Sequence, residues 1–172
     1  MSYNIFNQVH LPLKLALLSG CTALSENNFP DFSSAAKAVS KVEQALATFH
    51  HQQKFETENL LPLIFEYEPS IWVMCISEHH KVNNLARDVE NITRTYKRSE
   101  ITSEKQELMA RLVLSFNDFV LYNFNHMDNE EPILNEILWR YYDDKFIQQK
   151  GAEIGSIMQG AGTALMSMAK AA

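Results

Sequence analysis

Four long stretches of the sequence carry apolar residues at helical spacing, and none alternates apolar and polar residues as a half-buried strand would. We expect helices over about residues 4–19, from an N-cap at Ser33 or Ser34 to Ile64, from Pro69 past Val89, and from Ser103, with Gln106 as its capping-box partner, to about Tyr141. Short connections between long helices favour antiparallel neighbours. The sequence therefore predicts an all-α fold, an up-down-up-down antiparallel four-helix bundle.

The 172 residues fit one domain with a sizeable core, and a content of 46% hydrophobic and 21% charged residues is typical of a compact globular protein. We assign residues 1–146 to the bundle. Residues 147–172 form an apolar, glycine-spaced C-terminal tail of loosely helical pattern. We expect this tail to dock on the bundle or on a second subunit, which would make a homodimer.

The chain has 15 Lys and Arg residues against 21 Asp and Glu residues, a net charge of −6, so nucleic acids and anionic membranes are not expected partners. The segment LLSGC at 17–21 resembles a lipoprotein cleavage box, but Lys14 leaves too short an apolar run before it. Cys21 and Cys75 have neither disulfide-framework nor metal spacing and indicate buried thiols in a reducing compartment. We expect a cytoplasmic protein.

Polar side chains fall on the apolar faces of all four predicted helices. Consecutive residues of a helix advance by about 100° around its axis, so Phe119 and Ile137 lie within about 20° of His126, and Glu130 within about 40°. By the same calculation, at least one polar side chain of each of the other three helices faces inward. The full set is His10, Glu56, His79, His126 and Glu130.

Groups of this kind need partners when they are buried. A lone inward histidine is usually a hydrogen-bonded core residue, whereas an unpaired buried carboxylate costs several kcal/mol. Acid and imidazole groups contributed by four helices could satisfy one another or share a cation. Because imidazole and carboxylate are good ligands for transition metals, we predict a metal site inside the bundle.

The order of these residues resembles the hemerythrin-like, HHE cation-binding family. The resemblance covers about residues 3–146: an early His, ExxxLLP followed by EYEP, a later EH, and above all HMDNEE followed by ILNEILWRYYDD. It implies a four-helix bundle holding two non-haem irons through histidines on all four helices and two bridging carboxylates. His10, Glu56, His79, His126 and Glu130 match that pattern.

The sequence departs from the family at Gln52, where the family has a histidine four residues before the carboxylate Glu56. A π-bulge could bring His51 into that place, but it would rotate the preceding apolar residues by about 100° away from the face of Glu56. We therefore favour a regular helix with Gln52 inside.

An asymmetric site follows from this departure. His79, His126 and the carboxylates could hold one metal well, whereas the other would rely on His10, the shared carboxylates and the weakly donating amide oxygen of Gln52. We expect two irons with partial occupancy, or a single iron, zinc or manganese. Tyr122, one turn before His126, could contact the site from outside the ligands.

Two prolines lie just after proposed ligands, and each removes a backbone donor. We expect Pro62 to end its helix and Pro132 to kink a helix that continues through LNEILW. Such kinks could widen the space around the metal.

Motifs of other metal, hydrolase and nucleotide sites are missing from the sequence: ExxH, HExxH, the P-loop, GxGxxG and GxSxG. We expect a protein that binds dioxygen or a related small oxidant for sensing or storage, and catalysis is not implied. The alternatives are a bundle that has lost its metal through Gln52 and acts as an interaction or structural domain, and an oxidase or peroxidase that uses the same iron.

Overall fold

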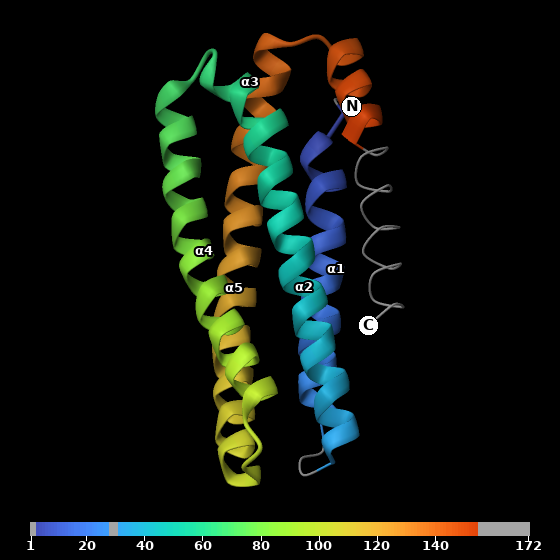
Figure 1. Ribbon diagram of the computed structural model, residues 1–172. Helices are drawn as coiled ribbons and strands as arrows, with labels where there is room; N and C mark the ends of the chain where they lie inside the picture. Colours follow the sequence, from blue (N-terminus) through green and yellow to red (C-terminus); the bar gives the residue numbers. More distant parts are fainter. Residues whose placement is uncertain (1–2, 28–30, 155–172) are drawn as a thin grey trace.

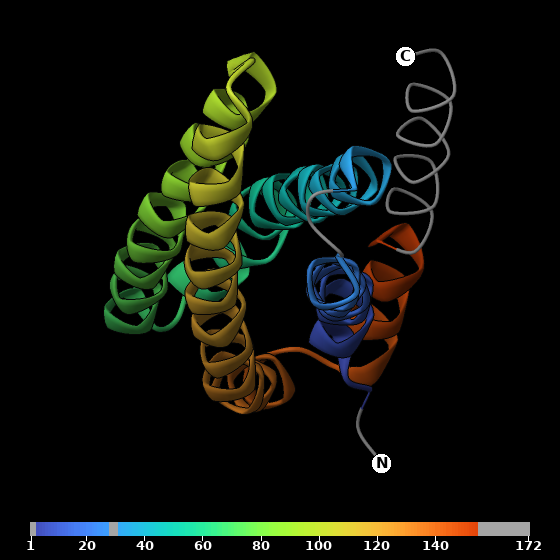
Figure 2. The ribbon, with the colours of Figure 1, turned by 90° about the horizontal axis from the view of Figure 1, so that it is seen from below.

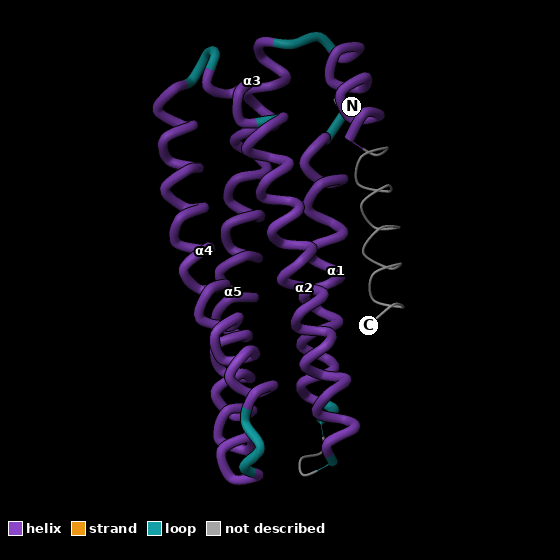
Figure 3. The backbone as a smooth tube through the Cα atoms, in the orientation of Figure 1, coloured by secondary structure: helices purple, strands orange, loops and turns teal. Residues whose placement is uncertain are grey.

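The computed structural model describes residues 3–27 and 31–154, and all regular secondary structure within them is helical (Figure 3). The labelled helices are α1 (Ile5–Ser25), α2 (Phe32–Asn59), α3 (Leu61–Phe65), α4 (Pro69–Arg98) and α5 (Thr102–Tyr141), and residues 144–154 are also helical. The predicted all-α class is confirmed. None of these helices combines the length and the apolar character that crossing a membrane requires.

The four long helices lie side by side, and the short α3 sits at the end where α2 leads into α4 (Figure 1). α1 packs most extensively on α2, and α4 on α5, while α5 also lies against α1 and α2 against α4. Long helices that follow one another in the chain run in opposite directions (Figure 1). Figure 2 shows the two pairs, α1 with α2 and α4 with α5, on either side of a common interior.

The start of α2 differs from the prediction. Its N-cap is Asp31, whose side chain accepts a hydrogen bond from the backbone N–H of Ser33 at 2.9 Å, so neither Ser33 nor Ser34 caps the helix. Asp and Ser are about equally good N-caps, and the sequence alone did not separate them.

The predicted capping box at Ser103 is also wrong. α5 begins at Thr102, and its N-cap Ile101 makes no side-chain capping bond. Instead, the hydroxyl of Ser99 donates to Glu104 at 2.6 Å and accepts from the backbone N–H of Ile101 at 3.3 Å. The turn before α5 is therefore closed by a residue outside the helix.

The two prolines act differently. α2 ends at Asn59 and Pro62 lies in the first turn of α3, so the helix predicted to reach Ile64 is divided in two near this proline. α5 continues through Pro132 to Tyr141, as predicted. The long final helix therefore carries its residues past the site without a break.

α1 continues beyond residue 19 to Ser25, and it includes Gly20. A Cβ on Gly20 would lie 2.6 Å from a ring carbon of Phe116. The glycine thus lets an aromatic ring of α5 pack directly on the backbone of α1, a contact that the sequence pattern does not reveal.

The first part of the predicted tail packs on the start of α1. Residues 144–154 are helical, and Ile147 and Ile154 are buried in the same apolar cluster as Ile5 and Phe6. Gly151 lies against Tyr3, where a Cβ would come within 2.4 Å of a ring carbon. The rest of the predicted tail, residues 155–172, lies outside the described residues, and the division at 146 stays a prediction.

Two apolar clusters fill the interior, with a polar layer between them. The cluster next to α3 contains Phe6, Val9, Phe55, Leu61 and Leu134, and the cluster toward the other end contains Leu13, Phe49, Val82, Phe116 and Met127. On α1, for example, His10 lies between Val9 of the first cluster and Leu13 of the second. Burial of apolar surface on both sides therefore holds the polar layer inside the protein.

Candidate metal centre

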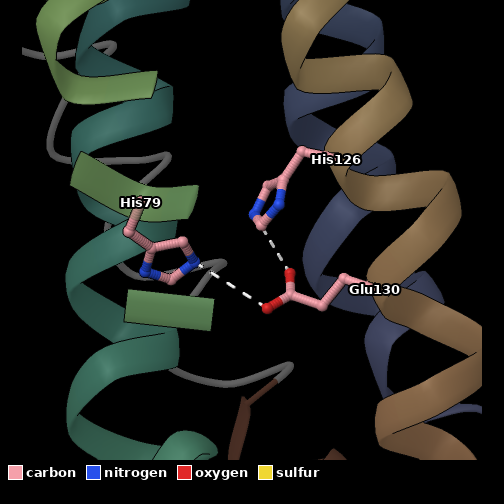
Figure 4. A group of neighbouring side chains, drawn as sticks. All are labelled: His79, His126 and Glu130. Atoms are coloured by element: carbon pink, nitrogen blue, oxygen red, sulfur yellow. Dashed lines mark ion pairs between the residues drawn. The ribbon is translucent and has the colours of Figure 1, made fainter. Parts of the chain in front are cut away.

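The polar layer has two sides, and on the α4–α5 side two imidazole rings point toward one carboxylate (Figure 4). His126 Nε2 lies 3.1 Å from Glu130 Oε2, and His79 Nε2 lies 3.9 Å from Glu130 Oε1. His126 and Glu130 are one turn apart on α5 and therefore share a face, while His79 comes from α4. The two rings are nearly perpendicular, with centroids 5.2 Å apart.

On the α1–α2 side, His10 lies between two carboxylates. Its Nε2 is 2.9 Å from Glu56 Oε1 and its Nδ1 is 3.3 Å from Glu131 Oε2. The second oxygen of Glu56 is 3.6 Å from His79 Nε2. Glu56 therefore connects the two sides of the site.

Gln52 lies in the interior, in the register that a regular helix gives it. α2 is an α-helix from residue 32 to 59, so no π-bulge turns His51 inward. The buried amide of Gln52 donates through Nε2 to Glu56 Oε1 at 2.7 Å. The side chain thus presents its nitrogen to Glu56, where the sequence had suggested the amide oxygen as a weak ligand.

Unpartnered polar atoms gather in this layer. Both ring nitrogens of His79, both carboxylate oxygens of Glu130 and the amide oxygen of Gln52 are buried and make no hydrogen bond among the described residues. Buried polar atoms of native proteins are almost always satisfied, and the one close contact of Glu130 is the ion pair with His126 at 3.1 Å. Their concentration between α2, α4 and α5 indicates a place for a cation.

The donor atoms fall into two groups that could hold a metal ion. The ligand atoms of His79, His126 and Glu130 lie within 4.8 Å of one another, and so do those of His10, Glu56 and Glu130. Two atoms bound to the same ion at about 2.1 Å are separated by about 3.0–3.4 Å. The separations of 3.1 Å for His126 with Glu130 and 2.9 Å for His10 with Glu56 are close to this value. Imidazole and carboxylate ligands suit iron, zinc and manganese.

The two histidines of the α4–α5 side differ in their electrostatics. Burial lowers the pKa of His79 below its usual value, despite the nearby carboxylates, so the ring is neutral and one of its nitrogens carries a free lone pair. Burial raises the pKa of Glu130. His126 and His79 lower this pKa by more than burial raises it, so the net pKa lies below the usual range. Burial likewise lowers the pKa of His126, and its contact with Glu130 raises it above the usual value.

His10 has the opposite electrostatics from His79. Burial lowers the pKa of His10, but Glu131 and Glu56 raise it more, to about 9. The hydrogen bond from His10 in turn lowers the pKa of Glu131 to about 2 against the effect of burial. On this side a protonated imidazole already supplies the positive charge that the carboxylates need.

All five predicted site residues lie in this one layer, and the remaining histidines lie outside it. His50 is exposed and pairs with Glu90 at 2.6 Å, His51 is half-buried, and His80 is exposed. The predicted role of Tyr122 changes, because its hydroxyl donates to Glu78, which lies beside His126, and to none of the five.

Glu131 was missed by the sequence reasoning. It binds His10 Nδ1 and also accepts from Asn4 at 2.6 Å. A carboxylate that binds the outer nitrogen of a metal-ligating histidine fixes the ring and its tautomer. The signal lay in the pair EE: adjacent helix positions differ by about 100°, so one carboxylate faces the centre while the next faces α1.

Comparisons of the chain with protein-family models, with curated proteins and with solved structures found no match. The hemerythrin-like resemblance therefore stays a prediction from the sequence.

Proposed function

We propose that the chain is a hemerythrin-type protein, an antiparallel four-helix bundle whose non-haem metal centre, with two irons as the expected occupants, binds dioxygen or a related small oxidant for sensing or storage. The packing of four long helices in two pairs supports this proposal, and so does the order of the site residues along the chain. Zinc or manganese would suit the same donors.

One observation carries the proposal. His79 and Glu130 have buried, unpartnered donor atoms, and they lie in the same layer as His10, Glu56 and His126. Without a cation, Glu130 has the imidazole of His126 at 3.1 Å as its partner, while both nitrogens of His79 are buried without a hydrogen bond among the described residues, which is unfavourable. With a cation the same atoms become ligands.

The residues of the chain would each have a part in the centre. The three imidazoles would anchor the metal, and Glu130 and Glu56 would link its two sides. An iron pair bound there would supply reversible electron transfer to dioxygen. Phe49 and Met127 line a cavity of about 10 Å³ beside Gln52, Glu56, His79 and His126, and these apolar walls limit water near the centre.

The dioxygen proposal is tested by spectroscopy of reduced, iron-loaded protein before and after exposure to air. We expect a new charge-transfer absorption that is lost again when oxygen is removed. The Glu130→Gln variant, treated in the same way, should show no such band. A spectrum of the unsubstituted protein that never changes would argue against oxidant binding, and steady consumption of oxidant would favour the oxidase or peroxidase alternative.

A second function, as a metal-free interaction or structural domain, is favoured by the hydrogen bonds already present on the α1–α2 side. His10 binds Glu56 and Glu131, and Gln52 donates to Glu56, so the imidazole and both carboxylates of this side have partners within the chain. Thermal melts with and without a chelator distinguish the two functions, because a metal that binds only the native state must raise Tm. A Tm that neither metal nor chelator changes supports the structural role.

A further inference from the structure

Exposed leucines line the outer edge where α1 meets α5. We call this set the leucine face: Leu11, Leu15, Leu18, Leu114 and Leu121. Each of the five residues is between 48% and 68% exposed. Apolar patches larger than a few hundred Å² are rare on monomeric proteins, and they mark interaction sites. The leucine face indicates such a site if its side chains adjoin one another.

Two contacts fix how α1 and α5 lie side by side. The ammonium group of Lys14 donates to Asp128 at 2.7 Å, and the thiol of Cys21 donates to Asn117 at 3.7 Å. α1 and α5 run in opposite directions (Figure 1). The part of α1 between Lys14 and Cys21 therefore runs beside the part of α5 between Asn117 and Asp128.

The leucines of both helices lie on the outer side of this contact line. Leu18 and Leu121 fall within the two adjoining parts, so they lie at the same level of the bundle. On α1 the three leucines lie about 40–100° to one side of Lys14, and the buried core residues lie about 60–100° to the other side. On α5 the two leucines lie about 40–60° from Asn117, again on the side away from the core. The five side chains therefore form one continuous apolar face.

The exposed surface of α1 carries no charge. Apart from the leucines, its exposed residues are Asn7, Gln8, Pro12, Ser19, Thr22 and Ser25. The one lysine of this helix, Lys14, is half-buried and pairs with Asp128. By contrast, α4 exposes Lys81, Arg87 and Asp88 among other charged residues. Because the centres of protein interfaces are depleted of charged residues, the surface of α1 has the composition of an interface.

A second copy of the chain fits the leucine face in charge. Each copy has a net charge of −6, so two copies repel one another, and an uncharged face is where they approach at the lowest cost. Arg111 and Asp118 lie on the rim of the face on α5. A symmetric contact repeats every pairing in both directions, so these opposite charges could pair twice across the interface.

The area of the leucine face is also sufficient for a dimer. With about 100 Å² of exposed surface on each leucine, the face amounts to about 500 Å² on each copy, or about 1,000 Å² in a dimer. This total is near the lower limit of specific interfaces between proteins, to which the uncharged residues of α1 add their own surface.

We propose that the leucine face joins two copies of the chain in a symmetric dimer, in which α1 and α5 of one copy pack on α1 and α5 of the other. This interface would give the predicted homodimer a surface other than the C-terminal tail. The proposal goes beyond the proposed function and does not rest on it, because no residue of the leucine face is a proposed metal ligand.

Sedimentation equilibrium of the chain over about 1–100 µM tests the proposal, and we expect the mass to rise toward twice that of the monomer. Leu15→Glu brings like charges from both copies into the interface and should raise the dimer Kd by about 100-fold or more. Val73→Glu is the matched control, because Val73 is also 59% exposed but lies on α4, and it should leave Kd unchanged. Circular dichroism checks that both variants keep their helices.

A dimer that Leu15→Glu leaves intact would overturn the proposal, because its interface would lie elsewhere. A chain that stays monomeric up to about 100 µM would also overturn it. If Leu15→Glu then lowered the free energy of unfolding and Val73→Glu did not, residues of the same chain would cover the leucine face. Elemental analysis of the same samples separates the two proposals: a dimer without metal uptake would sink the proposed function alone, and metal uptake by a monomer would sink the dimer alone.

Discussion

The two sides of the polar layer are built from the same residue types but differ in how their charges are balanced. On the α1–α2 side, His10 pairs with Glu56 and Glu131, and Gln52 donates to Glu56. On the α4–α5 side, both nitrogens of His79 and both oxygens of Glu130 lack a hydrogen bond among the described residues. Among the described residues, the first side leaves the amide oxygen of Gln52 unpartnered, whereas the second leaves both nitrogens of His79 unpartnered and gives Glu130 a single close partner, His126 at 3.1 Å.

This difference shows which side needs a cation more. A cation that entered the α1–α2 side would have to displace the hydrogen bonds of His10 and Gln52 and the proton of His10, whereas on the α4–α5 side it would displace the contact between His126 and Glu130 and satisfy the unpartnered nitrogens of His79. We therefore expect the first and tighter metal to bind His79, His126 and Glu130. The following predictions test that contrast, from the largest expected effect to the smallest.

The stability of the metal-free protein should respond very differently to the loss of His10 and of His79. His10→Ala leaves Glu56 and Glu131 without their cationic partner and should cost about 3–5 kcal/mol. His79→Ala removes unpartnered atoms and should cost at least about 1 kcal/mol less than that. Urea denaturation in the presence of a chelator measures both, and a larger loss for His79→Ala would contradict the comparison.

Replacement of Glu130 by Gln should abolish metal binding on both sides, because Glu130 belongs to both groups of ligand atoms. We expect an affinity loss above about 100-fold, since even outer partners of metal ligands contribute 10–100-fold. Competition with a chromophoric chelator measures the affinity. Glu131→Gln, at the next position of α5, is the control, and its loss should be smaller and confined to the His10 side.

A histidine at position 52 should strengthen metal binding on the α1–α2 side, where we expect the weaker metal. Gln52 already lies inside the layer next to Glu56, so Gln52→His would place an imidazole where an amide now donates a hydrogen bond. We expect the second metal to bind on the order of 10–100-fold more tightly. Gln53→His, one residue away and half-buried, serves as the control. Equal gains from both variants would mean that position 52 has no special access to the site.

Metal binding on the α1–α2 side, which contains His10, should weaken as the pH falls. The pKa of His10 is raised to about 9 in the metal-free protein, so at pH 7 a proton occupies the ring and must leave before a metal binds. Between pH 8 and pH 7 the affinity of this side should fall by about tenfold and each metal should release a proton. Calorimetry in buffers of different ionisation enthalpy would reveal that proton, and a pH-independent affinity would remove His10 from the ligands.

The angular positions of residues around each helix axis were enough to find the polar layer from the sequence. The angular position of a residue on a helix follows from spacing alone, so His10, Glu56, His79, His126 and Glu130 could be identified as inward-facing before any neighbour was known. The same reasoning placed Gln52 inside and kept His51 out of the site, as the structure has them.

Features that depend on the neighbouring helix were beyond the sequence. The role of Glu131 requires knowing that α1 lies beside α5, and the packing of Gly20 requires knowing that the ring of Phe116 lies against it. Asp and Ser have about equal N-cap propensity, so propensity did not identify Asp31 as the N-cap of α2. Spacing within one helix carries no information on any of these contacts.

The central claim is that a metal ion joins the inward-facing acid and imidazole groups, and anomalous scattering from crystals of protein purified without chelators tests it most directly. The account predicts a transition-metal peak within about 2.0–2.2 Å of donor atoms of His79, His126 and Glu130, with a weaker peak at His10 and Glu56. Crystals with no anomalous peak in this layer, even after they are soaked in iron or zinc, would contradict it.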